Sequence, residues 1–154
     1  MLTQNFINSI LNTTGSPTVI DTQGVSRNNL NPTGALNLYK QIFSTGAFIL
    51  GEGGGDASKS DINLTTPLDM SDFTAGTMQI SPTTVGGVVK SVFQNYYTFT
   101  GNSETTIHEV GLTLTTSWSG SGPDTATVLF AHEVLDSPIT VNNGDTFTVS
   151  MTIG

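Results

Sequence analysis

The segment TFTVSMTI, Thr146–Ile153, decides the fold class of this chain. Its apolar residues alternate strictly with threonine and serine: Phe147, Val149, Met151 and Ile153. Side chains point to opposite faces along a β-strand, so the pattern predicts a strand with one buried face and one face in water. The preceding NNGD, Asn142–Asp145, is typical of a turn. A strand is therefore predicted to begin at Thr146.

The two strands predicted before this one each contain the triplet His-Glu-Val, beginning at His108 and at His132. In the first strand the apolar pattern changes phase, because Ile107 falls on one face and Leu112 on the other. Such a change predicts a β-bulge at the triplet, or a strand that passes between sheets. In the second strand His132 shares a face with apolar residues, and Pro138 is predicted to end the strand.

Further upstream, the sequence predicts more β-structure and one short helix. VVKSVFQNYYTFT is a long strand that places four large residues on one face: Val89, Phe93, Tyr97 and Phe99. Ala47–Leu50 (AFIL) is a short buried strand that runs into a glycine-rich connector, and Ala35–Ser44 is the best helix candidate. Many strands and little helix predict an all-β protein, a β-sandwich expected to be of jelly-roll type.

Composition supports the all-β prediction and limits the partners. Thr is the most frequent residue and suits half-exposed strands, while only 10% of the residues are charged. The net charge of −8 leaves no basic surface for the phosphates of a nucleic acid or of an anionic membrane, so we predict neither partner. No apolar run approaches the roughly 20 residues of a membrane helix. The chain has no cysteine, so it has no disulfide framework and its redox compartment cannot be read. Because it also lacks a secretory signal pattern, we expect a chain made in a cytoplasm.

The His-Glu pairs raise the question of catalysis or metal binding. A zinc protease carries HExxH on a helix, whereas each pair here lies in a predicted strand without a second His four residues later. Neighbouring residues of a strand face opposite ways, so His108 and Glu109 are not expected to act on one substrate. A metal held by both His across a sheet, and a Ser-His-Asp triad, stay open as alternatives. We predict no enzyme activity, no catalytic residue and no metal or other cofactor.

Three other features are weak candidates for ligand binding. Gly51-Glu52-Gly53 lacks the residues that complete a nucleotide-binding loop, which favours a plain connector. Trp118 and the two adjacent tyrosines of the long strand suggest a sugar-binding surface, but adjacent residues face opposite ways, which favours packing. Acidic residues in a Ser-rich loop lack the spacing of a calcium site and are predicted to be solvated: Asp56, Asp61, Asp69 and Asp72.

The first 30 residues differ in composition from the rest. Four apolar residues have helical spacing, but the neighbouring Asn residues limit any helix. A turn-rich stretch follows, which fits either a strand and loop of the main domain or an extended arm that packs on a neighbouring subunit. We predict an N-terminal arm over residues 1–30 and a β-sandwich domain over residues 31–154. The predicted anchors of the arm are Phe6, Ile7, Ile10 and Leu11.

Five short motifs occur in a distinctive order: GALNLYKQIF (Gly34–Phe43), AFILGEG (Ala47–Gly53), DINLTTPL (Asp61–Leu68), TIHEVGL (Thr106–Leu112) and LFAHEVLDSPITVNNGDTFTVSMTI (Leu129–Ile153). This order resembles that of small structural proteins of tailed bacteriophages. Their pattern has D-x-x-L-x-x-P, T-E-[IV]-G-L and L-F-A-R-x-V at the corresponding places. The chain departs from it at His108, where Thr is usual, and at His132, where Arg is usual. If that Arg makes a charged contact, His132 would make it dependent on pH, so His132 joins the predicted interface residues.

The resemblance implies a virion component without catalytic activity, assembled in the host cytoplasm. A capsid decoration (cement) protein is expected, a homotrimer that bridges capsomers through contacts with itself and with the major capsid protein or other virion proteins. One alternative is a tail, neck or fibre component of the virion. Others are a host-glycan-binding module that uses Trp118 and a zinc enzyme that uses His108 and His132.

Overall fold

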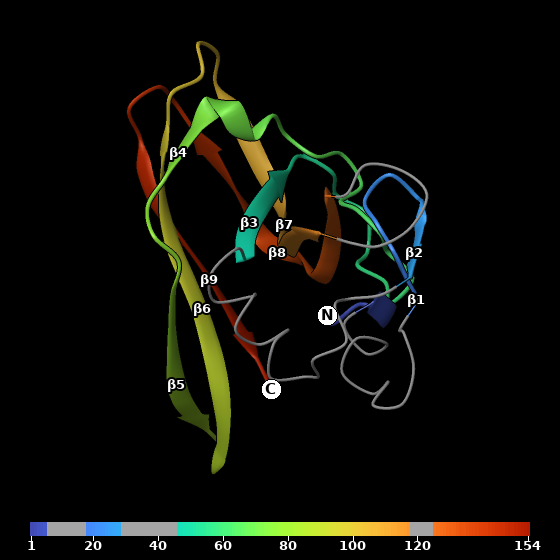
Figure 1. The fold of residues 1–154 in the computed structure, drawn as a ribbon. Helices are drawn as coiled ribbons and strands as arrows, with labels where there is room; N and C mark the ends of the chain where they lie inside the picture. Colours follow the sequence, from blue (N-terminus) through green and yellow to red (C-terminus); the bar gives the residue numbers. More distant parts are fainter. Residues whose placement is uncertain (6–17, 29–45, 118–124) are drawn as a thin grey trace.

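The computed structural model describes residues 1–5, 18–28, 46–117 and 125–154, and the regular secondary structure in these ranges is almost entirely β-strand (Figure 1). A single 3-10 turn, η1 (Met70–Asp72), precedes the fourth strand. The strands are β1 (Thr18–Ile20), β2 (Ser26–Asn28), β3 (Gly46–Gly51), β4 (Phe73–Ala75), β5 (Gln79–Val85), β6 (Val88–Phe99), β7 (Thr105–Ser117), β8 (Thr125–Val141) and β9 (Thr146–Ile153). The all-β prediction is confirmed. The helix predicted at 35–44 lies outside the described residues.

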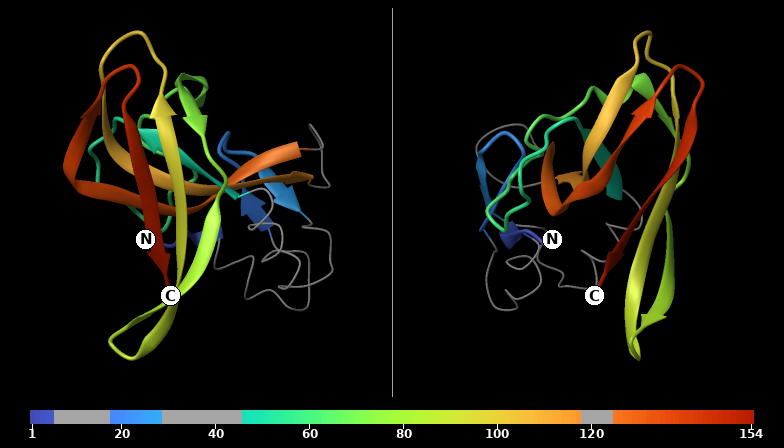
Figure 2. Two further views of the ribbon diagram at one scale, coloured as in Figure 1. Left: turned by 90° about the vertical axis from the view of Figure 1, so that its left-hand side faces the viewer. Right: turned by 180° about the vertical axis from the view of Figure 1, so that it is seen from behind.

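Two antiparallel sheets form the body of the described chain. In the first sheet, β7 lies between β3 and β8. In the second sheet, β6 is central: β9 pairs along one edge, while β4 and β5 pair in succession along the other. Figure 2 shows the long β5–β6 hairpin and β9 as one layer beside the first sheet. The short hairpin of β1 and β2 is a separate pairing.

The two sheets face each other across one hydrophobic core. Both sheets contribute large buried side chains to it: Phe48, Leu112, Phe130, Phe93, Phe99 and Met151. The hydroxyl of Tyr97 in β6 donates a hydrogen bond of 3.3 Å to the carbonyl oxygen of Phe48 in β3, so one side chain joins both layers. Burial raises the pKa of the Tyr97 phenol, which keeps the hydroxyl protonated as a donor. The arrangement is a β-sandwich; jelly-roll topology stays a prediction.

The structure confirms two predicted details of the strands. In β9, Val149 and Met151 are buried and the Thr and Ser residues that alternate with the apolar ones are exposed, as the pattern predicts. In β7, the pairing with β8 shifts register between Ile107 and Glu109, so the ladder is irregular at the first triplet, where the change of phase predicts a β-bulge or a strand that passes between sheets.

The predicted end of a strand at Pro138 is wrong. β8 continues through Pro138 to Val141. Its pairing with β7 leaves off at Val134 and resumes at Ile139, so the proline lies in the irregular stretch between the two ladders. Proline has no N–H to donate, and a stretch without ladder hydrogen bonds accommodates it inside a strand.

The described residues of the predicted N-terminal arm pack against their own chain. Leu2 forms a bridge with Ala131 along the edge of β8 that β7 does not occupy. Val19 in β1 is fully buried in the core, and the N–H of Thr22 donates to the carbonyl of Thr127 in β8. These segments are part of the folded domain. The predicted anchors lie outside the described residues, and their contact with a neighbouring subunit stays a prediction: Phe6, Ile7, Ile10 and Leu11.

Candidate functional site

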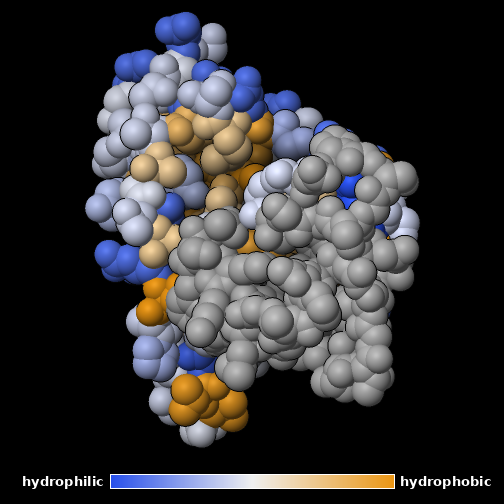
Figure 3. All heavy atoms as spheres, viewed as in Figure 1, coloured by the Kyte–Doolittle hydropathy of each residue, from blue (hydrophilic) through white to orange (hydrophobic). Residues whose placement is uncertain are grey.

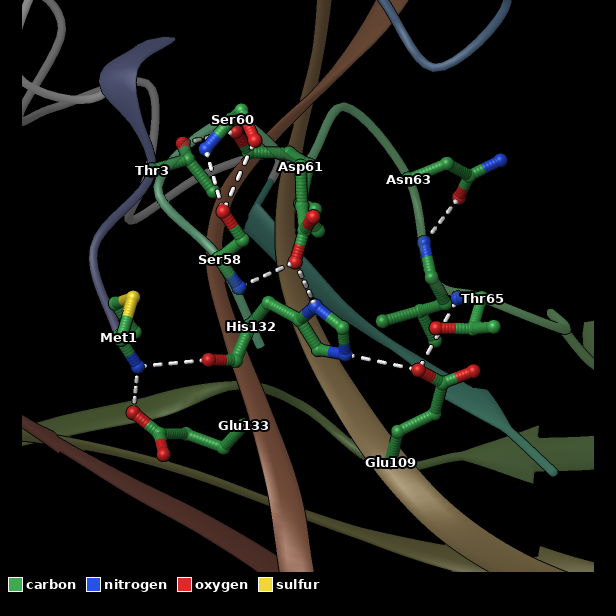
Figure 4. Close-up of polar contacts among 12 residues, drawn as sticks. Met1, Thr3, Ser58, Ser60, Asp61, Asn63, Thr65, Glu109, His132 and Glu133 are labelled. Atoms are coloured by element: carbon green, nitrogen blue, oxygen red, sulfur yellow. Dashed lines mark hydrogen bonds and ion pairs between the residues drawn. The ribbon is translucent and has the colours of Figure 1, made fainter. Parts of the chain in front are cut away.

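A cluster of two carboxylates and one histidine joins β7, β8 and the loop before η1 (Figure 4). The ring of His132 in β8 lies between the acids: Nδ1 is 2.6 Å from Oδ2 of Asp61, and Nε2 is 2.8 Å from Oε2 of Glu109. His132 is 1% exposed and Glu109 is not exposed at all, while the Asp61 side chain is 24% exposed. The cluster therefore connects a loop to the interior of a sheet.

Both acids also bind the backbone of the loop. Asp61 Oδ2 accepts a hydrogen bond of 2.7 Å from the N–H of Ser58. The two carboxylate oxygens of Glu109 accept from the N–H groups of Thr65 and Thr66, at 3.1 and 2.8 Å. Because both carboxylates act as acceptors, the ring is satisfied when both of its nitrogens carry protons and donate. Through these contacts the ring fastens the loop to β7 and β8.

Glycine is required beside Glu109 for reasons of space. A Cβ atom at Gly51 would lie 2.5 Å from Oε1 of Glu109, and one at Gly53 would lie 2.6 Å from the same oxygen. Such approaches are far shorter than van der Waals contact, so a side chain at either position would displace the buried carboxylate. The Gly-x-Gly pattern that begins at the last residue of β3 thus leaves room for the Glu109 side chain in the interior.

The geometry of the cluster is that of a structural connection. In a Ser-His-Asp triad one ring nitrogen faces the nucleophile, and in a metal site one ring nitrogen presents a lone pair to the ion. Both nitrogens of His132 face carboxylates instead. Within the described ranges, no group of three or more His, Cys, Asp or Glu side chains is arranged to hold a metal ion. His108 is half-exposed and lies near Gly54, so the two histidines do not share a site.

A second buried ion pair closes the turn between β1 and β2. Arg27 Nε and Nη2 each lie 2.8 Å from Oδ2 of Asp21, and both side chains are buried. Burial by itself raises the pKa of Asp21, but hydrogen bonds from the Val25 and Gln23 amides and the Arg27 guanidinium outweigh it. The pKa of Asp21 therefore lies below its ordinary value. The same carboxylate satisfies the backbone of the turn.

The tip of the β5–β6 hairpin is an exposed apolar surface. Val85, Val88 and Val89 are 52%, 56% and 69% exposed. Gly86 and Gly87 between them have φ values of 58° and 79°, which a two-residue hairpin turn of type I′ requires. Figure 1 shows the hairpin projecting past the body of the fold, and Figure 3 shows an apolar patch at its end. We define these three valines as the valine tip.

Val89 of the valine tip is exposed, although its position in β6 shares a face with the buried Phe93. The pairing of β6 with β9 begins at Ser91, opposite Ile153, so β6 extends past the layer that covers its inner face. Val89 continues the alternation of β6 but lies beyond the core. A period-two pattern predicts which residues share a face, and the length of the neighbouring strands decides how far that face is covered.

A groove with a volume of about 450 Å³ lies between β8 and β9. Its floor is apolar and belongs to the core, with Leu50, Ile107 and Val149 among the lining residues. Leu135 and Ile139 of β8 also line it and are more exposed than the floor. We call this the β8–β9 groove. Its size is that of pockets that enclose a small ligand or a few side chains.

Of the predicted interface residues, the described part of the chain contains only His132. Its ring lies inside the chain, and its charged contact is made with Asp61 and Glu109. Sequence analysis missed Asp61 as a partner because 71 positions separate it from His132, and no local pattern marks such a pair. The valine tip did carry a local signal, since the Gly-Gly pair marks a hairpin end where side chains are exposed.

The chain matches none of the protein-family models, curated proteins or solved structures with which it was compared. In the described ranges, no helix has the length and apolar composition needed to cross a membrane. Function is therefore inferred from the sequence motifs and from the geometry of the cluster, the tip and the groove.

Proposed function

We propose that this protein is a structural component of a tailed-bacteriophage virion, a capsid decoration protein that stabilises the shell by bridging capsomers. Its partners are further copies of itself, expected as a trimer, and the major capsid protein. It acts by surface contact and not by catalysis. It is assembled in the host cytoplasm and is located in the virion.

The observation that carries this proposal is the valine tip. The exposed positions of β9 are all Thr or Ser, whereas the end of the projecting hairpin carries three exposed valines. Contiguous exposed apolar surface is typical of sites that contact another macromolecule. A projecting apolar hairpin on a compact sandwich fits a protein that docks on neighbours.

The positions of the family-like motifs also support the proposal. Gly51, Asp61, Glu109 and His132 come from four of the five motifs, and they meet in one cluster. An Arg at the position of His132 would likewise present several donors to the two acids. Four of the motifs therefore serve one structural purpose in the sandwich, which supports reading their order as one pattern.

In physical terms, such a protein stabilises a shell by burying apolar surface across the joints between capsomers. Each Å² of apolar area removed from water contributes about 25 cal/mol. Many copies act at once, so a modest gain at each joint opposes the outward pressure of packaged DNA. The acidic surface of the chain keeps the free protein soluble until it docks.

The proposal is tested by imaging particles with and without the protein and by adding purified full-length chain to particles that lack it. We expect density for the sandwich at repeated positions on the shell, and decorated particles that retain their DNA at higher temperature than bare ones. A few copies confined to the tail or neck would refute decoration and support the alternative virion role. Absence from purified particles would refute both.

A further inference from the structure

The valine tip has no described surface of its own chain to pack against. Near the tip, Val85 pairs with Val88 and Thr84 pairs with Val89, so the two strands contact only each other. β6 is continuous from Val88 to Phe99, and β9 reaches no further along it than Ser91. This unbroken strand holds the tip away from the body and prevents it from folding back onto the β8–β9 groove.

The β8–β9 groove is bordered by strand edges. Six consecutive residues of β9, from Phe147 to Thr152, line it. Side chains of successive residues face opposite ways, so the groove runs along the edge of β9 and not along one face. Among the described strands, β9 pairs only with β6 and β8 pairs only with β7. A free edge presents N–H and C=O groups to an incoming strand, and the apolar floor presents a surface to its side chains.

The charges near the two surfaces are complementary. The chain has only four Lys and Arg residues against twelve Asp and Glu residues, and one of the four, Lys90, directly follows the valine tip. On the groove side, Glu133 lines the groove and forms an ion pair with the N-terminal ammonium group of Met1, and Asp136, between the lining residues Leu135 and Ser137, adds a second carboxylate to an acidic rim. A cation beside the tip favours approach to this acidic rim, while the valines meet the apolar floor.

We infer that the valine tip of one copy of this chain inserts into the β8–β9 groove of a second copy. The inference deepens the proposed function, because it rests on the self-association proposed there and names the contact that produces it. The hairpin brings apolar side chains to the floor, a strand edge to the edge of β9, and Lys90 to the acidic rim.

Tip and groove are different surfaces, so the contact is head-to-tail. Each copy offers one tip and one groove, and a head-to-tail contact closes into a ring when the rotation between copies permits. A closed ring leaves neither surface exposed. A ring of three would be the trimer that the sequence resemblance implies.

Disulfide formation between two introduced cysteines, one in each copy, tests the contact. The natural chain contains no cysteine, so any disulfide must join the introduced positions. Full-length Val88→Cys and Ser137→Cys chains, one of them tagged, are mixed under mild oxidation. We expect a disulfide-linked heterodimer, since insertion brings the tip position of one copy to the groove position of the other. The control pair replaces Ser137→Cys with Gln23→Cys, an exposed position in the β1–β2 turn. Equal yields from the two pairs would overturn the inference.

The mass of the assembly in solution gives a second measurement. The V88T/V89T chain keeps two β-branched residues in the hairpin, so it is expected to fold with an unchanged unfolding midpoint. By sedimentation, we expect its self-association to weaken by about tenfold or more. Each Val→Thr change replaces one methyl group with a hydroxyl, so two methyl groups no longer contribute apolar burial to the contact. Association at full strength in this variant, or a natural chain that stays monomeric, would overturn the inference. A chain that associates through tip and groove but does not bind shells would support the inferred contact between copies and refute the capsid role.

Discussion

At the scale of single residues, the ring of His132 holds three segments together through two hydrogen bonds to carboxylates. Removing the ring would leave Asp61 and Glu109 close together without the side chain that lies between them and contacts both. The loss of one partner from a buried ion pair is costly because the remaining charge is uncompensated.

Replacing His132 with Gln should therefore lower the free energy of unfolding by about 3 kcal/mol. The matched control is His108→Gln, the same change in the same triplet, which should cost within about 0.5 kcal/mol because His108 is half-exposed. Urea unfolding of both variants measures the difference. Equal losses would show that the cluster does not stabilise the fold as described.

Sequence patterns predict one part of this cluster, the irregular position of Glu109, but not the contact between Asp61 and His132. The irregular pairing beside Glu109 is visible in the sequence, because the apolar residues of β7 change phase there. The partnership of Asp61 with His132 is not, because it depends on where a loop lies in three dimensions. Asp61 resembles any other acid in a Ser-rich loop until the sheet is built.

At the scale of elements, the β1–β2 hairpin is held by charge inside its turn. Asp21 accepts from two backbone amides of the turn and from Arg27 on the second strand. The three-residue strands form few ladder hydrogen bonds, so this carboxylate contributes much of what keeps the hairpin closed. Its sequence, DTQGVSR, reads only as a turn, and the pairing of Asp21 with Arg27 is a property of the folded element.

Asp21 makes the stability of the protein depend on pH. Its pKa is lower in the folded chain than in the unfolded one, so the unfolded chain binds the proton first as the pH falls. The contribution is fully present above the ordinary Asp pKa of about 3.9 and is lost as the pH falls through the lower folded value. In urea unfolding, Asp21→Asn should therefore be less stable than the natural chain at neutral pH, with the gap narrowing in acid. A gap that stays constant with pH would contradict this assignment.

Strand periodicity predicts individual elements well where they lie inside the sandwich. β9 follows the expected pattern of burial, whereas β3, predicted to be buried, buries Phe48 and Leu50 but leaves Ala47 exposed. The error at Pro138 and the exposure of Val89 occur where a strand leaves regular pairing, at an irregular stretch of β8 and beyond the end of β9. The alternation of apolar residues shows on which face of a strand a residue lies. Pairing with distant strands decides whether that face is buried.

At the scale of the whole molecule, the N-terminal hairpin belongs to the same core as the sandwich. Val19 is fully buried in that core, while the next residue, Ile20, is 41% exposed. The predicted division at residue 30 rested on composition, and polar composition does not show that a short segment covers an apolar surface. Deletion of the first 30 residues would remove part of the core.

Val19→Ala should lower the stability of the entire fold by about 2 kcal/mol and shift a single unfolding transition. Ile20→Ala is the matched control and should change the midpoint little, because its side chain is largely in water. Thermal unfolding followed by circular dichroism and by tyrosine fluorescence checks both points. Two separate transitions, or equal effects of the two substitutions, would show that the hairpin is an independent unit.

The pairing of distant strands has a consequence for the order of events during synthesis. β3 must wait for β7, and β6 must wait for β9, whereas the β5–β6 hairpin needs only neighbouring residues and is able to close early. The valine tip thus forms on a growing chain before any groove exists, because both walls of the groove come from β8 and β9, which are synthesised after the hairpin. A copy becomes able to receive a neighbour's tip only after β9 has been made and has paired with β6, so assembly by this contact selects molecules whose second sheet has formed.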